Sequence, residues 1–207
     1  MAVSNAKIYA VLALILASRA GGAVQVPADQ PIDLDAQSFY TDVTNNVVFR
    51  KVRITQGAMS ISADLGQGQS QNQGSKQATG LDFDNSLWTF RGNVKITTGD
   101  GQLSADDAQI TFAKQRLYKA TANGKQAEFQ GQVEKTGKVA HGRANTIDYD
   151  AVKGVVRLLN SAWLTYGETE LRGDSLKYNV GQSIVAEGTE PDSQRVHITI
   201  TPPPAKP

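Results

Sequence analysis

The 207-residue chain contains no cysteine, so neither a disulfide bond nor a thiolate metal site can form. Its 21 basic and 20 acidic residues give a formal net charge of +1, and this balance excludes the strongly basic surface that is typical of nucleic-acid binding. A folded core in such a chain must therefore be held by side-chain packing and backbone hydrogen bonds alone.

Long hydrophobic runs are missing as well. The apolar segment at residues 8–17 is only ten residues long, whereas about 20 are needed to span a bilayer. A polar start, this segment and the small residues that follow are typical of a secretory signal peptide. We expect cleavage after Ala20 or Ala23. Cleavage after Ala23 removes residues 1–23, and the loss of Lys7 and Arg19 changes the formal charge from +1 to −1.

Patterns that carry catalysis or bind ions are absent from the sequence. Neither His141 nor His197 belongs to a metal-binding motif, and no serine or glycine cluster matches a nucleophile elbow or a phosphate loop. A calcium-loop-like start at residues 82–87 has Leu87 where the glycine is required. The acidic pairs that could support acid–base chemistry are Asp82/Asp84, Asp106/Asp107 and Asp148/Asp150. We therefore expect no cofactor, no metal and no enzymatic activity.

Alternation of apolar and polar residues dominates the remaining chain. In residues 88–96, for example, Trp88, Phe90, Val94 and Ile96 share one face of a strand, and polar side chains share the other. Such a period of two predicts half-buried strands, and helical signals are nearly absent. The sequence predicts an all-β domain over residues 24–201, a flexible Gln/Gly-rich loop at 66–80 and a proline-rich tail at 202–207.

A strand–turn–strand phrase occurs four times with a constant internal spacing. From an inward position, each phrase reaches an Asp or Asn twelve residues later, in the pairs Val52/Asp64, Val94/Asp106, Val133/Asn145 and Ala162/Asp174. The distances between phrases vary, at 42, 39 and 29 residues. Fixed hairpins with variable connections indicate a stacked repeat. The inward parity switches at the Asp or Asn, which predicts a bulge where each strand bends from one sheet into the next.

The interior of such a stack can be lined by side chains of matching parity. Arg91, Lys95 and Arg157 should point to solvent, and Gly92 and Gly131 should leave space inside. The expected lining residues are Trp88, Phe90, Val94, Ile96, Ile110, Phe112, Phe129, Val133, Ile147, Tyr149, Leu158, Leu164 and Tyr178. Periodicity alone does not distinguish a filled core from two sheets that part to hold an apolar ligand.

Several short motifs together resemble the LptA/OstA-like family of lipopolysaccharide transport proteins. They are DQPIDLDAQSF at residues 29–39, the repeated F-x-G-x-V-x-I-T-x-G strands, the L-x-A-D and L-x-G-D corners, and HGRANTIDYD at residues 141–150. The resemblance runs from about Asp29 to Gly188 and departs from the compact pattern at the 66–80 insert. It is closer to the periplasmic bridge members than to their membrane-anchored relatives.

This resemblance implies a partly open antiparallel β-jelly roll of two facing sheets. It also implies a periplasmic protein that binds the lipid A acyl chains of lipopolysaccharide in an apolar groove. Head-to-tail copies, together with inner-membrane-anchored and outer-membrane components, would form the transport bridge. Two other hypotheses remain: a structural or adhesive β-solenoid with a filled core, and a secreted hydrolase of glycans or lipids.

Overall fold

The computed structural model describes residues 30–41, 46–70, 83–99, 101–132, 139–179, 183–186 and 197–200. No helix among them is long and apolar enough to cross a membrane. The expected signal peptide, the tail at 202–207, Val133 and residues 71–80 of the expected loop lie outside the described residues.

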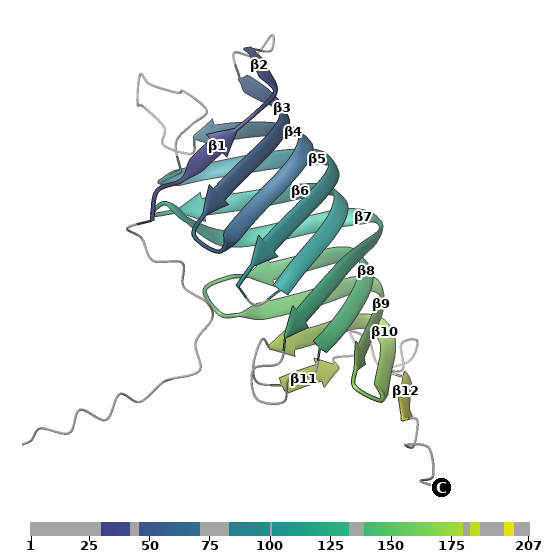
Figure 1. The fold of residues 1–207 in the computed structure, drawn as a ribbon. Helices are drawn as coiled ribbons and strands as arrows, with labels where there is room; N and C mark the ends of the chain where they lie inside the picture. The colour runs from purple at the N-terminus through teal and green to yellow at the C-terminus, as the bar shows by residue number, and fades with distance from the viewer. Residues whose placement is uncertain are drawn as a thin grey trace, which may run out of the picture.

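The described residues form one antiparallel sheet of twelve strands that does not close on itself. Strands β3 to β10 follow one another in sequence order, and short strands flank them at both ends (Figure 1). The bounds are β1 Asp33–Asp35, β2 Ser38–Thr41, β3 Val47–Gln56, β4 Met59–Ser70, β5 Asn85–Thr98, β6 Gly101–Ala113, β7 Arg116–Gln132, β8 Val139–Asp150, β9 Val155–Tyr166, β10 Thr169–Asn179, β11 Ser183–Ala186 and β12 His197–Ile200.

Each long strand bends near its middle, so the single sheet folds into two facing layers (Figure 1). Layer A comprises residues 47–50, 65–70, 85–91, 107–113, 116–123, 146–150, 155–159 and 175–179, and also β2 and β11. Layer B comprises residues 52–56, 59–63, 94–98, 101–105, 127–132, 139–144, 162–166 and 169–173, and also β1 and β12. The predicted open antiparallel jelly roll is confirmed, and its two facing sheets are halves of one continuous sheet.

The bends form a line across the sheet, which we call the corner line. Register shifts mark it in successive strand pairs, for example between Arg91 and Val94 of β5 and between Gly173 and Ser175 of β10. An extra residue in one strand increases local twist and bends it. The predicted corner at the small residue and the following Asp or Asn is therefore confirmed.

Polar side chains at the corner line form hydrogen bonds with one another. Asp64 accepts a hydrogen bond from Lys51 Nζ at 2.6 Å and one from Asn93 Nδ2 at 2.7 Å. The bond from Lys51, followed by that from Asn93, holds the pKa of the Asp64 carboxyl below its ordinary value. Lys51 and Asn93 both have a φ of 50°, in the left-handed region that few non-glycine residues adopt. Asp106 accepts the backbone N–H of Lys125 at 3.1 Å, the role expected for a corner carboxylate.

Three of the four predicted hairpin registers agree with the structure, and one is wrong. Val52, Val94 and Ala162 lie opposite Ala63, Ala105 and Gly173, just before the corner Asp. In the third hairpin, however, Ala127 lies opposite Ala144. The position assigned to Val133 therefore belongs to Ala127, because the β7–β8 hairpin is longer than the other three.

The expected start of the Gln/Gly-rich loop at Gly66 is also wrong. β4 continues to Ser70, and Gly66 is buried opposite Phe90 of β5. A Cβ atom on Gly66 would lie 2.7 Å from Val52 Cγ1 and 3.2 Å from the Phe90 ring. Glycine is needed here because side chains from the core cover the strand, not because the backbone is irregular.

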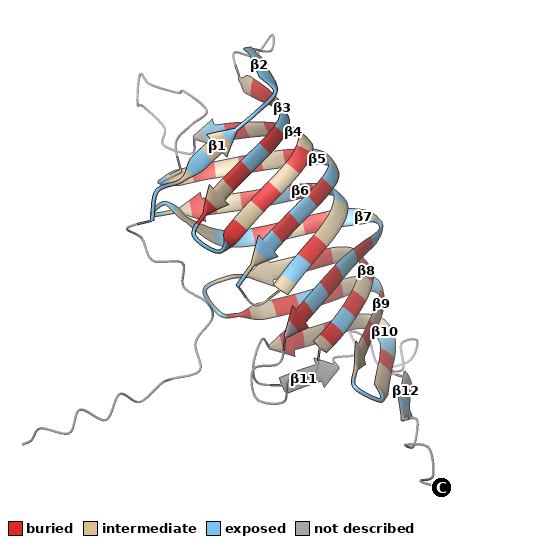
Figure 2. Cartoon of the chain, viewed as in Figure 1, coloured by how far each residue is buried: buried red, intermediate tan, exposed pale blue. Residues whose placement is uncertain are grey.

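Burial alternates along the strands as the period of two predicts (Figure 2). Phe90, Val94, Ile96, Phe129, Leu158 and Leu164 are buried, whereas Arg91, Lys95 and Arg157 are exposed. The core therefore lies between layers A and B along their whole described length.

Candidate functional site

The predicted lining residues converge between the two layers. Tyr149 is half-buried, and Val133 lies outside the described residues. The remaining predicted residues are all buried: Trp88, Phe90, Val94, Ile96, Ile110, Phe112, Phe129, Ile147, Leu158, Leu164 and Tyr178. Sequence periodicity thus identified the inner face, but not how full it is.

Aromatic rings fill the interior near the N-terminal end of the sheet. The Trp88 ring stacks on Phe83, with 5.0 Å between centroids and an interplanar angle of 10°, and on Phe90 at 5.9 Å and 15°. Phe49 also stacks on Trp88, with 6.0 Å between centroids, and Phe112 meets Phe83 edge-on at 5.1 Å. Such offset and edge-on pairs are favourable arrangements, so this end is a packed core.

The layers also touch directly further along the sheet. Phe129 of layer B contacts Tyr178 of layer A, with 5.7 Å between ring centroids. Gly142 of layer B faces Leu158 of layer A so closely that a Cβ atom would lie 2.5 Å from Leu158 Cδ2. In this closed arrangement, opposing side chains meet where a groove would run.

The two mid-strand glycines do not leave space, contrary to our expectation. Gly92 lies on the corner line with a φ of 74°, and a Cβ atom there would lie 2.7 Å from Asp64 Oδ2. Gly131 is covered by the ring of Phe129, whose Cζ would lie 2.5 Å from an added Cβ. Both glycines are required by close neighbours, not by an internal void.

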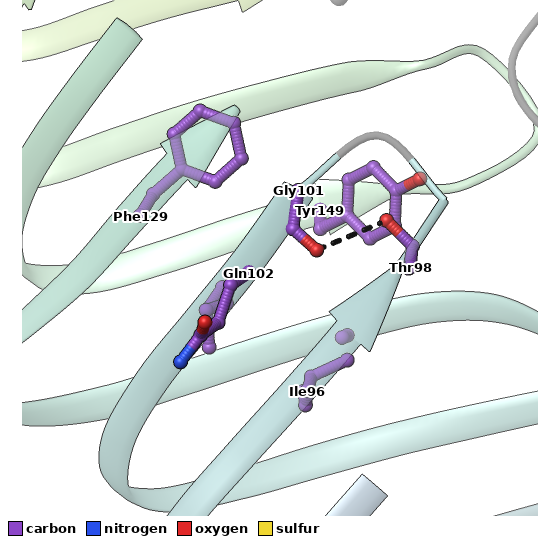
Figure 3. Close-up of a pocket in the computed structure, with 8 residues that line it drawn as sticks. Ile96, Thr98, Gly101, Gln102, Phe129 and Tyr149 are labelled. Atoms are coloured by element: carbon purple, nitrogen blue, oxygen red, sulfur yellow. Dashed lines mark hydrogen bonds between the residues drawn. The ribbon is translucent and has the colours of Figure 1, made fainter. Parts of the chain in front are cut away.

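The edge opposite the corner line, where the strands end in turns, is the rim at which the interior meets solvent. A small cavity at this rim, which we call the rim cavity, lies between the two layers (Figure 3). Ala120 and Tyr149 contribute from layer A, and the layer B residues are Ile96, Thr98, Gly101, Gln102, Leu103 and Phe129. Its lining is almost wholly apolar, and the Thr98 hydroxyl donates to the Gly101 carbonyl at 3.4 Å.

The rim cavity has a free volume of about 30 Å³, enough for a water molecule but not for an acyl chain. Larger occupants therefore require the layers to move apart. Ile96, Phe129 and Tyr149 of this lining were predicted from the sequence, whereas Ala120 and Leu103 were not. Leu103 shows the inward parity of its strand, so the signal was present, whereas nothing in the sequence places Ala120 at the rim.

At the N-terminal end of the rim, a polar side chain connects the two layers by a hydrogen bond. Gln56 of layer B is buried and donates its Nε2 to the carbonyl oxygen of Gln115 at 2.9 Å and to that of Gln30 at 3.1 Å. Gln115 lies in the β6–β7 turn of layer A. Gln56 was missed by sequence reasoning, although a polar residue at an inward position after Val52 and Ile54 is a visible signal.

The described members of the acidic pairs and His141 take part in local contacts or face solvent, and Asp82 lies outside the described residues. Asp148 accepts a bond from Thr121 Oγ1 at 2.8 Å, and Asp150 accepts the backbone N–H of Lys153 at 3.0 Å. His141 is exposed, as expected, while the side chain of His197 lies outside the described residues. Across the described ranges, no group of three or more His, Asp or Glu side chains could hold a metal ion.

Comparisons with known proteins agree on one family. The family described as "LptA/(LptD N-terminal domain) LPS transport protein" matches residues 74–184, more than half of the chain. The lipopolysaccharide export system protein LptA of Escherichia coli K12 is 31% identical over 102 residues, which cover 48% of this chain and 55% of that protein. LptA of Haemophilus influenzae is 31% identical over 112 residues, covering 52% and 64%. The chain thus spans between half and two thirds of the length of these relatives.

The fold is similar to that of a solved structure. The crystal structure of LptH from Pseudomonas aeruginosa, described as the LptA homologous periplasmic component of the lipopolysaccharide transport device, aligns with a TM-score of 0.52. The alignment covers 86% of this chain and all of LptH, at 17% identity. With its open, bent antiparallel sheet and its matched segment, the chain belongs to the LptA/(LptD N-terminal domain) family of LPS transport proteins.

Proposed function

We propose that the chain is a periplasmic transport protein that binds lipopolysaccharide, holds its acyl chains between layers A and B, and carries it from the inner toward the outer membrane. The observation that carries this proposal is an apolar inner face that runs along every long strand and reaches solvent at a rim lined by Ile96, Phe129 and Tyr149. Family membership supports the choice of lipopolysaccharide over another lipid.

Acyl chains enter by separating the layers at the rim cavity. The cavity lining there is almost wholly apolar, whereas parting the Gln56 end would break the buried hydrogen bond from Gln56 to Gln115. Each CH₂ group removed from water contributes about 0.8 kcal/mol, so a few acyl chains offset the loss of contacts such as Phe129 with Tyr178. The near-neutral chain requires that most of the affinity come from this burial.

The ends of the sheet are the proposed contacts with other proteins. Only short strands flank β3 and β10, namely β1 and β2 at one end and β11 and β12 at the other. Short edge strands leave backbone groups for pairing with a further strand. Head-to-tail pairing of copies gives an open filament, and its ends would engage the inner-membrane-anchored and outer-membrane components of the machinery.

Two further parts of the proposal concern location and chemistry. We place the protein in the periplasm, reached through removal of residues 1–23. We assign it no catalytic activity and no cofactor, since the Asp148 and Asp150 carboxylates are engaged by Thr121 and Lys153 outside the inner face.

Site-specific photo-crosslinking tests the proposal. A photoreactive residue is placed at the inward rim positions Ile96, Phe129 and Tyr149, and at the outward positions Lys95 and Gln109 as matched controls. With folding monitored by circular dichroism, the inward probes should trap lipopolysaccharide and the outward probes should not. Equal labelling of both sets in folded protein would mean that the interior is a permanently filled core, as in a structural solenoid.

A further inference from the structure

A cleft with several cationic side chains lies on the outer face of layer A, and we call it the cationic cleft. Its volume is about 390 Å³. Lys119, Lys153, Arg157 and Lys177 supply positive charge, and Asp148 and Asp150 supply negative charge. The cleft thus carries a local excess of cations on a chain whose formal charge is only +1.

The carboxylates of the cleft are already bound by neighbours. Asp150 accepts the backbone N–H of Lys153 at 3.0 Å and lies 3.9 Å from its ammonium group. Asp148 accepts the Thr121 hydroxyl at 2.8 Å. These contacts fix the two carboxylates in the strands and in the β8–β9 turn.

Two of the cations have no carboxylate partner among the described residues. Lys119 and Arg157 are both exposed and form no salt bridge there. The ammonium group of Lys119 lies 5.4 Å from the centroid of the Tyr118 ring, a weak contact at an exposed site. Asp150 lies directly across from Lys119 and Asp148 from Arg157 on neighbouring strands. Since both carboxylates are engaged by other groups, the two cations can also contact an anion in the cleft.

The cationic cleft and the rim cavity lie on opposite faces of layer A. Ala120 and Tyr149 line both. Ala120 is buried on the inner face, whereas its neighbour Lys119 is exposed on the outer face, so the two surfaces are one sheet thickness apart. A ligand whose apolar part enters between the layers would pass its polar part around the β8–β9 turn, which carries Lys153, to reach the cleft.

We propose that the cationic cleft binds the phosphate groups of the glycolipid whose acyl chains enter the rim cavity. This inference rests on the proposed function and deepens it by assigning a place to the head group. Ammonium and guanidinium groups donate charge-assisted hydrogen bonds to phosphate, and the planar guanidinium of Arg157 can donate two in parallel. Because the cleft is open to water, its contribution to affinity is modest, and it acts mainly by setting the orientation of the lipid.

The test compares two glycolipids on the full chain. One is a lipid A carrying both phosphates, and the other is the same lipid with the phosphates removed. Affinities are measured for the native chain, for the Lys119→Gln/Arg157→Gln variant and for an Arg91→Gln/Lys95→Gln variant, which removes the same charge from exposed positions outside the cleft. Each is measured at low and at high salt.

The cleft variant should bind the phosphorylated lipid about tenfold more weakly at low salt and lose most of the salt dependence. Its affinity for the dephosphorylated lipid, and both affinities of the control variant, should change less than about twofold. Equal weakening for both lipids, or an equal effect of the control variant, would overturn the inference while leaving acyl binding intact. Binding of inorganic phosphate to the cleft without any effect on lipid would overturn it too. A native chain that binds neither lipid would refute the proposed function itself.

Discussion

The side-chain amide of Gln56 in layer B donates a hydrogen bond to the carbonyl oxygen of Gln115 in layer A, at 2.9 Å. The two residues are 59 positions apart in the sequence, and their contact joins the layers across the rim. The proposed separation of the layers at the rim cavity does not involve this bond.

Replacing Gln56 by Ala should destabilise the protein and loosen this end of the rim. The change leaves two carbonyl oxygens without their donor, which costs about 1–3 kcal/mol in the free energy of unfolding. Thermal unfolding followed by circular dichroism should show a melting temperature lower by several degrees, and hydrogen exchange in the β6–β7 turn should accelerate. The exposed Gln109→Ala variant is the control, and a loss of stability equal to that of Gln56→Ala would contradict the assignment.

Replacing Gly66 by Ala distinguishes a strand from a loop. In a mobile loop, alanine is neutral or slightly stabilising because it restricts the unfolded chain. In β4 the added methyl group meets Val52 and Phe90, and such overpacking costs about 1–3 kcal/mol in the free energy of unfolding. Denaturant unfolding of Gly66→Ala, of Val52→Ala and of the double variant measures the coupling.

The double variant should be more stable than the sum of the two single effects implies, because Val52→Ala removes the obstructing methyl group. Gln67→Ala, on the outward face of the same strand, should change stability little. Additive single effects would show that Gly66 does not lie beneath Val52.

The contacts of Asp64 predict a stability that depends on pH. Because the hydrogen bonds from Lys51 and Asn93 lower the pKa of Asp64 in the folded state, the unfolded state binds the proton more readily. The contribution is fully present above the ordinary Asp pKa of about 3.9 and is lost as the pH falls through the lower, folded value. The native protein should therefore exceed Asp64→Asn in melting temperature at neutral pH, and the difference should shrink on acidification. A difference that stays constant down to pH ~2 would contradict this assignment.

Cross-linking the layers should block the uptake of lipid. Since the chain has no cysteine, Thr98→Cys and Tyr149→Cys would introduce its only thiols, one on each side of the rim cavity. A cleavable bifunctional maleimide joining them should reduce glycolipid binding by at least about tenfold, because most of the affinity comes from acyl burial. Cleavage of the linker should restore binding.

The matched control joins Ser60→Cys to Thr97→Cys, which lie opposite each other within layer B and do not line the rim cavity. This linkage leaves the layers free to part, so binding should be retained. Full binding with the Thr98–Tyr149 linkage intact would mean that the layers need not separate at this cavity.

Most of the architecture could be predicted because it is repeated. The alternation from Trp88 to Ile96 and the twelve-residue offset to a corner Asp are local patterns, and a two-residue period determines which side chains face inward. The register failed in the third hairpin, where Val133 was taken for the position of Ala127. A longer hairpin moves the inward positions along the chain without changing the amino-acid composition. The constant offset of twelve residues therefore gave an incorrect alignment in this hairpin.

The sequence could not predict how completely side chains fill the space between layers A and B. Because Gly131 has no side chain, the sequence predicted free space beside it, but the ring of Phe129 occupies that space. Which ring occupies the space depends on contacts between strands that are distant in the chain, such as Phe129 with Tyr178. The same holds for the β6–β7 turn, where Lys114 and Gln115 have φ angles of 51° and 58° without the glycine or asparagine that such a turn favours.

The corner line crosses each successive hairpin, so every hairpin contributes one arm to layer A and one to layer B. A protein with this geometry can grow or shrink by whole hairpins, each adding about 10 Å of length at the usual strand spacing, without altering how the two layers face each other. A one-residue insertion within a strand has the opposite effect, because it shifts the alternation of that strand and interrupts the apolar inner face. Length is therefore a variable quantity in this architecture, whereas the position of the bend within each hairpin is fixed.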